Sequence, residues 1–305
     1  MTGVVLLALI AAGTIPAADA LATARWPHRT PRTAIALWQS LGLAWGLATI
    51  GALLGFAVLP YGKGVLGGLI QLSAGDGGAL GVIQLTALGA ALSLTAILLA
   101  MLFAAVIGVV RARRRHRALL ALVARDSGVR GTVVLDHPTA AAYCVPGVLS
   151  SKVVVSAGTL RLLDQAELAA VLAHERAHVR ERHDLVLLPF ASLRQVFPGF
   201  RLVARCLDAV ELLIEMRADD RAKRHRQPKL LAMALLRFAA AKPAAAPSGA
   251  LAASGPGALP ADGGPIMARV RRLLDPHPVG RPAQAATLTA AVAITAIPLL
   301  LFVLP

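Results

Sequence analysis

The residues from His174 to His178 read His-Glu-Arg-Ala-His, which is the H-E-x-x-H pattern. On a helix, two histidines at this spacing lie one turn apart on the same face, so their ring nitrogens can reach a single metal ion. Glu175 follows the first histidine and is close enough to take a proton from a metal-bound water molecule. The pattern therefore predicts a metal-dependent hydrolytic site, with His174 and His178 as ligands and Glu175 as general base.

Signals outside the motif predict that it lies on a helix. The residues from Asp164 to Glu167 have the form of a capping box, in which the aspartate caps exposed backbone N–H groups and the glutamate reaches back from the third helical position. Arg180 and Arg182 suit the negative end of the helix dipole. An apolar stripe at helical spacing separates these ends and comprises Leu168, Val171 and Leu172. The alternative is an amphipathic surface helix with two solvated histidines, and acidic residues downstream disfavour it.

Those acidic residues are Glu211, Glu215 and Asp219, each four positions from the next. On a helix they would stack on one face and repel one another, and a nearby cation would relieve the repulsion. A zinc site with two histidines takes a carboxylate from a second helix and keeps one position open for water. A further carboxylate usually orients a ligating imidazole through its other ring nitrogen. Glu215 and Asp219 fit these two roles, and Glu211 is the next candidate ligand.

The combination of H-E-x-x-H with a downstream E-x-x-A-D resembles the gluzincin-type membrane metallopeptidases. These include the HtpX and CAAX-prenyl endopeptidase group and the BlaR/MecR antirepressor family. The residues from Ala170 to Asp184 look most similar to the BlaR/MecR side, as do Val145-Pro146-Gly147 and the run from Val153 to Ser156. Penicillin-sensing members continue into an extracellular sensor domain after their last membrane helix. This sequence stops at Pro305, which argues against antibiotic sensing but not against a protease.

The resemblance implies a zinc endopeptidase and assigns a role to each residue that matches the motifs. His174, His178 and Glu215 would bind Zn²⁺, Glu175 would act as general base, and Asp219 would support a ligand. The implied substrate is a cytoplasmic protein, in particular a BlaI/MecI-like winged-helix repressor whose cleavage relieves transcription. One alternative is an HtpX-like protease for quality control or processing of membrane proteins. An alternative of another class is a non-catalytic signalling scaffold, in which the helices only transmit a membrane signal.

The composition indicates an integral membrane protein that also holds a polar domain. Of the 305 residues, 57% are hydrophobic and only 15% are charged, against about 25% charged in ordinary soluble domains. The net charge of +15 is typical of cytoplasmic anchoring beside anionic lipid headgroups. Direct nucleic-acid binding is disfavoured, because the basic residues flank apolar runs and no nucleic-acid motif is present. The lipid bilayer is therefore an expected partner.

Four apolar runs are long enough to cross a membrane. Basic residues lie between the first and second runs and directly after the third, at residues 111–117, whereas the glycine-rich loop 60–78 is nearly uncharged. The positive-inside rule then places the two basic segments and the zinc motif in the cytoplasm, and both chain termini outside. A multi-pass protein of a bacterial-type cell membrane is expected. The runs comprise residues 4–22, 34–59, 80–110 and 285–304.

The predicted fold is mainly α: a four-span integral membrane protein with a cytoplasmic α+β gluzincin-like zinc metallopeptidase domain. Residues 1–110 would hold three membrane helices, residues 111–282 the peptidase domain, and residues 283–305 the fourth helix. A flexible loop is expected at residues 239–264, which are rich in Ala, Pro, Gly and Ser.

Short β-branched runs at residues 132–135 and 152–155 predict a small sheet beside the zinc helix. An exposed edge strand could align an extended peptide by backbone pairing. Val153, Val154 and Val155 form the candidate substrate-binding edge, and a buried hairpin is an equally good interpretation of the same run.

Three further side chains are candidates for roles at the site. A third zinc histidine of the metzincin kind would fall at position 184, which is Asp184, so His183 is interpreted as a residue at the end of the zinc helix. His225 could contact a substrate or oxyanion, although a solvated histidine in a basic run explains it better. Tyr143 could polarise an oxyanion, and its simpler interpretation is a packed aromatic residue.

Overall fold

The computed structural model describes residues 1–75, 80–126, 132–145, 152–224, 226–241, 251–252, 264–277 and 279–303. Two units make up the chain and are described separately. Unit 1 comprises Met1–Phe103, Leu193–Ala209 and Val279–Pro305, and unit 2 comprises Ala104–Ser192 and Val210–Pro278.

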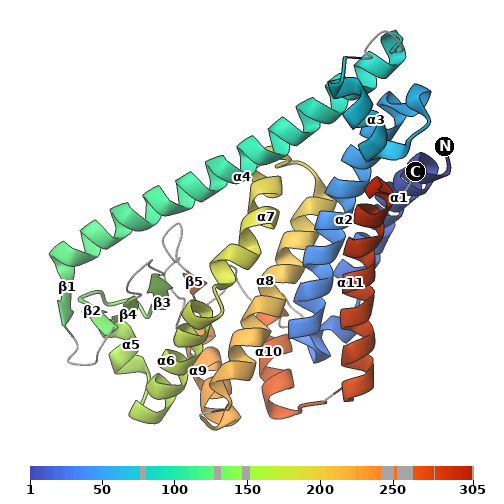
Figure 1. The fold of residues 1–305 in the computed structure, drawn as a ribbon. Helices are drawn as coiled ribbons and strands as arrows, with labels where there is room; N and C mark the ends of the chain where they lie inside the picture. The colour runs from blue at the N-terminus through green and yellow to red at the C-terminus, as the bar shows by residue number, and fades with distance from the viewer. Residues whose placement is uncertain are drawn as a thin grey trace. The chain divides into compact units, whose positions relative to one another are not determined.

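Apolar helices dominate unit 1. Helices α1 (Thr2–Thr23), α2 (Pro31–Ala57) and α11 (Arg281–Val303) pack against one another (Figure 1). With α4 (Val82–Val123), they are the helices in the described part of the chain that are long and apolar enough to cross a membrane. The apolar runs expected from the sequence are therefore all helical, and α2 begins a little earlier than predicted because Pro31 occupies its first turn.

Helix α2 comes close to its neighbours at two glycines. A Cβ atom on Gly51 would lie 2.5 Å from the ring of Phe302 in α11, and one on Gly55 would lie 2.8 Å from the side chain of Val4 in α1. Small residues allow apolar helices to approach this closely, and in a bilayer such packing replaces hydrophobic burial as a source of helix association.

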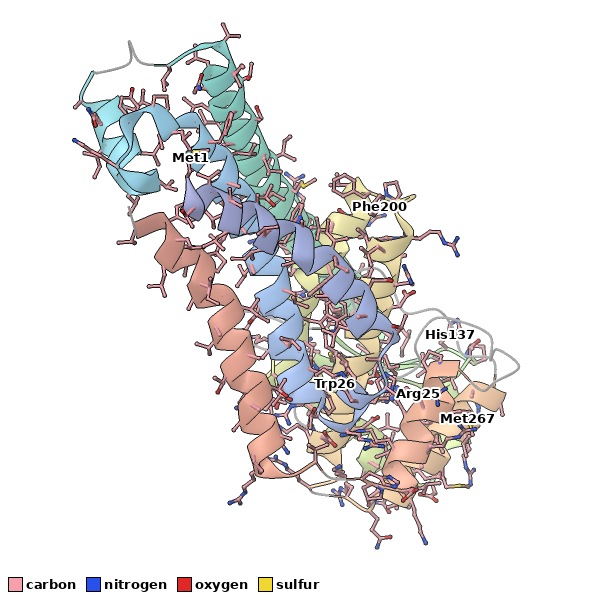
Figure 2. All side chains as sticks on the ribbon, turned by 90° about the vertical axis from the view of Figure 1, so that its right-hand side faces the viewer. Met1, Arg25, Trp26, His137, Phe200 and Met267 are labelled. Carbon is pink, nitrogen blue, oxygen red and sulfur yellow. The ribbon has the colours of Figure 1, made fainter. Side chains whose placement is uncertain are left out.

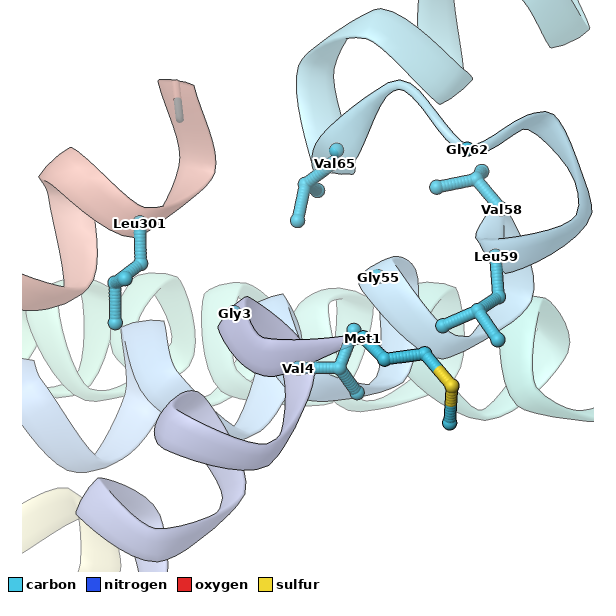
Figure 3. A pocket seen from close by; sticks show the side chains of 10 residues that line it. Met1, Gly3, Val4, Gly55, Val58, Leu59, Gly62, Val65 and Leu301 are labelled. Atoms are coloured by element: carbon cyan, nitrogen blue, oxygen red, sulfur yellow. The ribbon is translucent and has the colours of Figure 1, made fainter. Parts of the chain in front are cut away.

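A small cavity lies at the Met1 end of unit 1 (Figure 3). Its volume of about 80 Å³ is well below the roughly 300 Å³ of a typical small-molecule site. Its walls carry no titratable side chain; they are formed by Met1, Gly3, Val4, Gly55, Val58, Leu59, Gly62, Gly64, Val65 and Leu301.

The basic segment between α1 and α2 forms a short 3₁₀ helix, η1 (Trp26–Arg29). Figure 2 shows Arg25 and Trp26 at the end of α1 opposite Met1. The side chain of Asp19, in the last part of α1, lies 2.6 Å from that of Arg205 in α8 (Arg201–Ala222).

Two segments differ from the sequence-based expectation. The glycine-rich loop 60–78 contains η2 (Leu59–Tyr61) and a helix, α3 (Gly64–Ser73), in which Val65 is buried. The third apolar run, expected to end at residue 110, continues as one helix, α4, through the arginine-rich segment. Arginine has a high helix propensity and no Gly or Pro follows Gly108 in this helix, so nothing interrupts it.

Unit 2 contains a five-stranded sheet in the order β1-β2-β4-β3-β5. Strands β2 (Thr132–Leu135) and β4 (Lys152–Ser156) were both predicted, and they pair in parallel. Strand β3 (Ala142–Val145) was not predicted; it pairs antiparallel with β4. The remaining strands are β1 (Ala124–Asp126) and β5 (Leu251–Ala252), which pair antiparallel with β2 and β3.

The prediction that β4 is an exposed edge is wrong. It lies between β2 and β3, so partners occupy both of its hydrogen-bonding sides, and Val153, Val154 and Val155 are buried. Three consecutive buried valines are typical of an interior strand covered on both faces. These residues therefore do not provide the edge on which an extended substrate was expected to pair.

The helix that carries the zinc motif packs against strands β3, β4 and β5 of this sheet. The zinc-motif helix α6 (Gln165–Arg180) shares an apolar core with α9 (Pro228–Ala240) and α10 (Gly264–Leu274), centred on Val171, Phe238 and Leu273. A second cluster joins Leu120 of α4 to Tyr143 and other strand residues. Unit 2 also contains α5 (Ala157–Leu162), most of α7 (His183–Val196) and the part of α8 from Val210 onward.

Candidate active site

Helix α6 positions the motif residues as the sequence predicts. Its capping box is formed: Asp164 Oδ1 accepts from the N–H of Glu167 at 2.8 Å, and Glu167 Oε2 accepts from the N–H of Asp164 at 3.1 Å. His174, Glu175 and His178 are completely buried on the same helix. The Nε2 atoms of the two histidines lie 3.1 Å apart, so both rings point to the same place.

Helix α8 brings a carboxylate to the same place. Glu215 Oε2 lies 3.3 Å from His174 Nε2, and its Oε1 lies 3.4 Å from His178 Nε2. Ligand atoms of these three residues all lie within 4.8 Å of one another. In the part of the chain that the structure describes, they form the group that could hold a metal ion, and Glu211 does not belong to it.

Asp219 lies one turn further along α8 and faces the other nitrogen of His174. Its Oδ1 is 2.9 Å from His174 Nδ1, and its side chain is buried. A carboxylate in this position fixes the orientation of the imidazole and makes Nε2 a better ligand. Asp219 therefore lies beside His174, and its role as support for this ligand stays a prediction.

The donor set fits zinc. Two imidazole nitrogens and one carboxylate are the ligands of many catalytic zinc sites, which keep a fourth position for water or substrate. Glu175 lies on α6 directly after the first ligand, where a general base for such a water is needed.

The protonation states also suit a cation. Burial lowers the pKa of His178 to about 3, so this ring is neutral at neutral pH. Burial alone would raise the pKa of Glu215, but the charge of Arg269 and the interactions with the two histidines outweigh it and lower the pKa to about 2. Burial alone would lower the pKa of His174, but Asp219 and Glu215 outweigh it and raise the pKa to about 9. Metal binding would therefore displace a proton from His174.

His183 lies much closer to the site than the sequence suggests. It begins α7, directly after Arg182, which adopts a left-handed conformation (φ 51°) between α6 and α7. Such a conformation costs a non-glycine residue roughly 1–2 kcal/mol. The His183 side chain is buried, and its Nδ1 lies 3.0 Å from Nδ1 of His178. His183 thus supports His178 on the side opposite the metal-facing nitrogen.

Glu181 extends this chain of contacts. Its Oε2 lies 3.4 Å from His183 Nε2. It also accepts from Arg217, at 2.7 Å from both Nε and Nη2, and from Arg221. Burial alone would raise the pKa of Glu181, but the two arginines outweigh it and lower the pKa to about 2. An ionised carboxylate is therefore held beside His183.

Arg269 was not predicted as a site residue. It lies on the short helix α10, where it is buried and faces the site. Its Nη1 lies 2.8 Å from Glu215 Oε2. A buried position in α10 is a tertiary property, and nothing in the local sequence distinguishes Arg269 from the exposed Arg271.

The remaining candidates do not join this cluster. Tyr143 packs with Leu120 and Val154, and its hydroxyl lies 3.1 Å from Nε2 of His116. This contact agrees with the packed-aromatic interpretation. His225 lies outside the described residues.

A comparison with protein-family models agrees with this geometry. The model of Peptidase family M48 matches residues 110–246. The matched segment contains His174, Glu175, His178, Glu215 and Asp219. The match supports a gluzincin-type membrane metallopeptidase, and similarity to family M48 implies a zinc metalloprotease. The match does not single out the BlaR/MecR family. No curated protein and no solved structure matches the chain significantly.

Proposed function

We propose that this protein is a membrane-embedded zinc endopeptidase that cleaves a cytoplasmic protein. The observation that carries the proposal is the convergence of His174, His178 and Glu215 beside the buried carboxylate of Glu175. A plain structural core has no use for two imidazoles and a carboxylate that point to one place, because burying ionisable groups is costly. The match to a metallopeptidase family supports the same conclusion.

Each residue of the cluster then has a defined task. His174, His178 and Glu215 would hold zinc, which supplies polarisation of the scissile carbonyl and a bound water with a pKa near neutral. Glu175 would accept the proton of the attacking water and pass it to the nitrogen of the leaving amine. Asp219 and His183 hold the two ligand rings through their outer nitrogens.

The location proposed for this chemistry is the cytoplasmic face of a cell membrane. Four long apolar helices support the membrane assignment. The basic residues at 25–32 and 111–117 support a cytoplasmic side for the segments that contain them, with both termini outside. The first segment lies between α1 and the first turn of α2, and the second follows the apolar part of α4, as positive-inside signals should.

Two substrate classes follow from the resemblance in the sequence. The first is a BlaI/MecI-like winged-helix repressor, whose cleavage would relieve transcription; similarity of residues 170–184 to the BlaR/MecR family supports it. The second is a membrane protein cleaved for quality control or processing, as in the HtpX group. The M48 match favours this second class, because it supports the wider group of membrane metallopeptidases and does not single out antirepressors.

Cleavage by the purified protein tests the proposal. Wild type and Glu175→Gln are compared in detergent against a winged-helix repressor encoded beside the gene and against an unfolded protein, and new N-termini are mapped by mass spectrometry. We expect cleavage by wild type and a loss of at least 100-fold in the variant, which should still bind zinc, because general-base catalysis contributes roughly 10²–10⁴-fold.

The two substrates separate the proposed classes, since an antirepressor should cut the repressor at one site and a quality-control protease should prefer the unfolded chain. Equal cleavage by Glu175→Gln would contradict the mechanism. A zinc-loaded wild type that cuts neither substrate would favour a non-catalytic scaffold.

A further inference from the structure

Arg269 is an arginine inside an apolar core. It is 2% exposed, and its neighbours on α10, Val270 and Leu273, pack in the core shared with α6 and α9. Removing a guanidinium from water costs several kcal/mol unless ion pairs and hydrogen bonds compensate. Arg269 also lies beyond the segment that matches the peptidase family, because that segment ends at residue 246. Its contacts must therefore explain its position.

Those contacts are with the two carboxylates of the candidate metal site. Arg269 Nε donates to Asp219 Oδ2 at 2.9 Å, and Nη2 donates to Asp219 Oδ1 at 2.8 Å. Nη1 lies 2.8 Å from Glu215 Oε2. One planar guanidinium thus spans both acidic residues across a helical turn, which its fork of N–H donors allows and a lysine ammonium does not.

The arrangement constrains how the two carboxylates face the histidines. Arg269 holds Oε2 of Glu215, the oxygen that lies 3.3 Å from His174 Nε2, while Oε1 lies 3.4 Å from His178 Nε2. Oδ1 of Asp219 lies between the guanidinium and His174 Nδ1, at 2.8 and 2.9 Å. Without Arg269, two like charges one turn apart would repel each other and rotate away from these positions.

Charge balance also explains why an arginine is buried beside these carboxylates. Glu175, Glu215 and Asp219 bring three negative charges into one buried region. A bound zinc ion and the Arg269 guanidinium together bring three positive charges, so the loaded site would be neutral. Buried charges are tolerated when they are balanced and hydrogen-bonded.

We propose that Arg269 is a positioning residue of the metal centre, which holds Glu215 toward the two ligand histidines and Asp219 toward the outer nitrogen of His174. This inference rests on the proposed function. It adds a residue from α10 to a site otherwise built from α6 and α8, and it makes docking of α10 a condition for high metal affinity.

Two other roles for Arg269 predict different outcomes. If it only tied α10 to α8, then Arg272 would be equivalent, because Arg272 links the same helices through Asp220 at 2.7 Å and the Met216 carbonyl at 3.3 Å. If Arg269 acted only through its charge, removing that charge would strengthen the binding of a cation, and a lysine would be as good as an arginine.

The test is the zinc affinity of the purified full-length protein in detergent, measured by chelator competition for wild type, Arg269→Met, Arg269→Lys and Arg272→Met. The visible absorption bands of bound Co²⁺ report the ligand geometry in the same proteins, and thermal unfolding reports the fold. We expect both Arg269 variants to bind zinc 10–100-fold more weakly, the usual effect of removing a partner of a metal ligand, and to alter the Co²⁺ bands. Arg272→Met should change affinity by less than about threefold, even where it lowers the unfolding temperature.

Each outcome separates the alternatives. Tighter zinc binding by Arg269→Met with an unchanged Arg269→Lys would overturn the positioning role in favour of a charge effect. Equal losses of zinc affinity in Arg269→Met and Arg272→Met would show that Arg269 only holds α10 against α8. If Arg269→Met does not fold, the zinc affinity of Arg269→Lys is the deciding measurement. This variant retains the buried positive charge and loses only the forked arrangement of N–H donors. A wild type that binds zinc and cleaves protein while Arg269→Lys matches it would overturn this inference alone, whereas a wild type without zinc affinity would overturn the proposed function as well.

Discussion

The protonation of His174 gives a quantitative prediction for zinc binding. With a pKa raised to about 9, this ring carries a proton at neutral pH in the metal-free protein. His178, with a pKa of about 3, and Glu215, with a pKa of about 2, are already deprotonated. Zinc must therefore displace one proton from the protein, and that proton comes from His174.

The size of the pH dependence of zinc affinity follows from the release of this single proton. Below the pKa of His174, each drop of one pH unit should weaken zinc binding about tenfold, or about 1.4 kcal/mol. Between pH 7 and pH 5 the affinity should therefore fall about 100-fold. This window lies below the pKa of about 7 that zinc gives its bound water, so ionisation of that water adds little.

Calorimetric titration with zinc measures both the change of affinity with pH and the number of protons released. Titrations in buffers of different ionisation enthalpy count the released protons, and we expect about one per zinc between pH 5 and pH 7. Asp219→Asn removes the carboxylate 2.9 Å from His174 Nδ1 and should lower the pKa of His174. In this variant the count at pH 7 should fall below one. Asp220→Asn is the matched control, because Asp220 pairs with Arg272 and Lys223.

An affinity that does not vary between pH 5 and pH 7 would refute this reasoning. So would an Asp219→Asn variant with the same slope and proton count as wild type, because Asp219 would then not control His174.

Two further predictions concern the support of the site and the core of unit 2. His183→Phe keeps an aromatic ring but removes the nitrogen that lies 3.0 Å from His178 Nδ1. Zinc affinity should therefore fall about tenfold, with little change in unfolding temperature. An unchanged zinc affinity would show that His183 only fills space. Phe238 is 1% exposed, so Phe238→Ala should lower the free energy of unfolding, measured in denaturant titrations, by about 3–5 kcal/mol. Met233 on the same helix is 48% exposed, so Met233→Ala should lower it by less than about 1 kcal/mol. Equal losses in the two variants would contradict the packing described for α9.

Much of the site follows from spacing within single helices. The H-E-x-x-H pattern, the capping box and the i, i+4 relation of Glu215 and Asp219 depend on helical periodicity, which is a local property. The structure brings His174, His178, Glu215 and Asp219 together and forms the capping box. The apolar runs were similarly visible, because length and hydropathy are sufficient to identify a long apolar helix.

What the sequence did not show depends on contacts between distant segments. Whether β4 is an edge strand is decided by β3, whose pairing is not visible in the residues of β4 itself. His183 reaches His178 only because Arg182 turns the chain through a left-handed conformation. Arg269 lies 50 residues beyond Asp219, and its burial results from how α10 packs.

The most direct test of the central claim is the zinc content of the detergent-purified protein, compared with that of Glu215→Ala and Glu211→Ala. Both substitutions remove a glutamate from the same helix one turn apart, and only Glu215 belongs to the cluster with His174 and His178. We expect about one zinc per chain in wild type and Glu211→Ala, and a large loss in Glu215→Ala. Zinc retained by Glu215→Ala and lost by Glu211→Ala would move the third ligand, and wild type without zinc would contradict the metallopeptidase site itself.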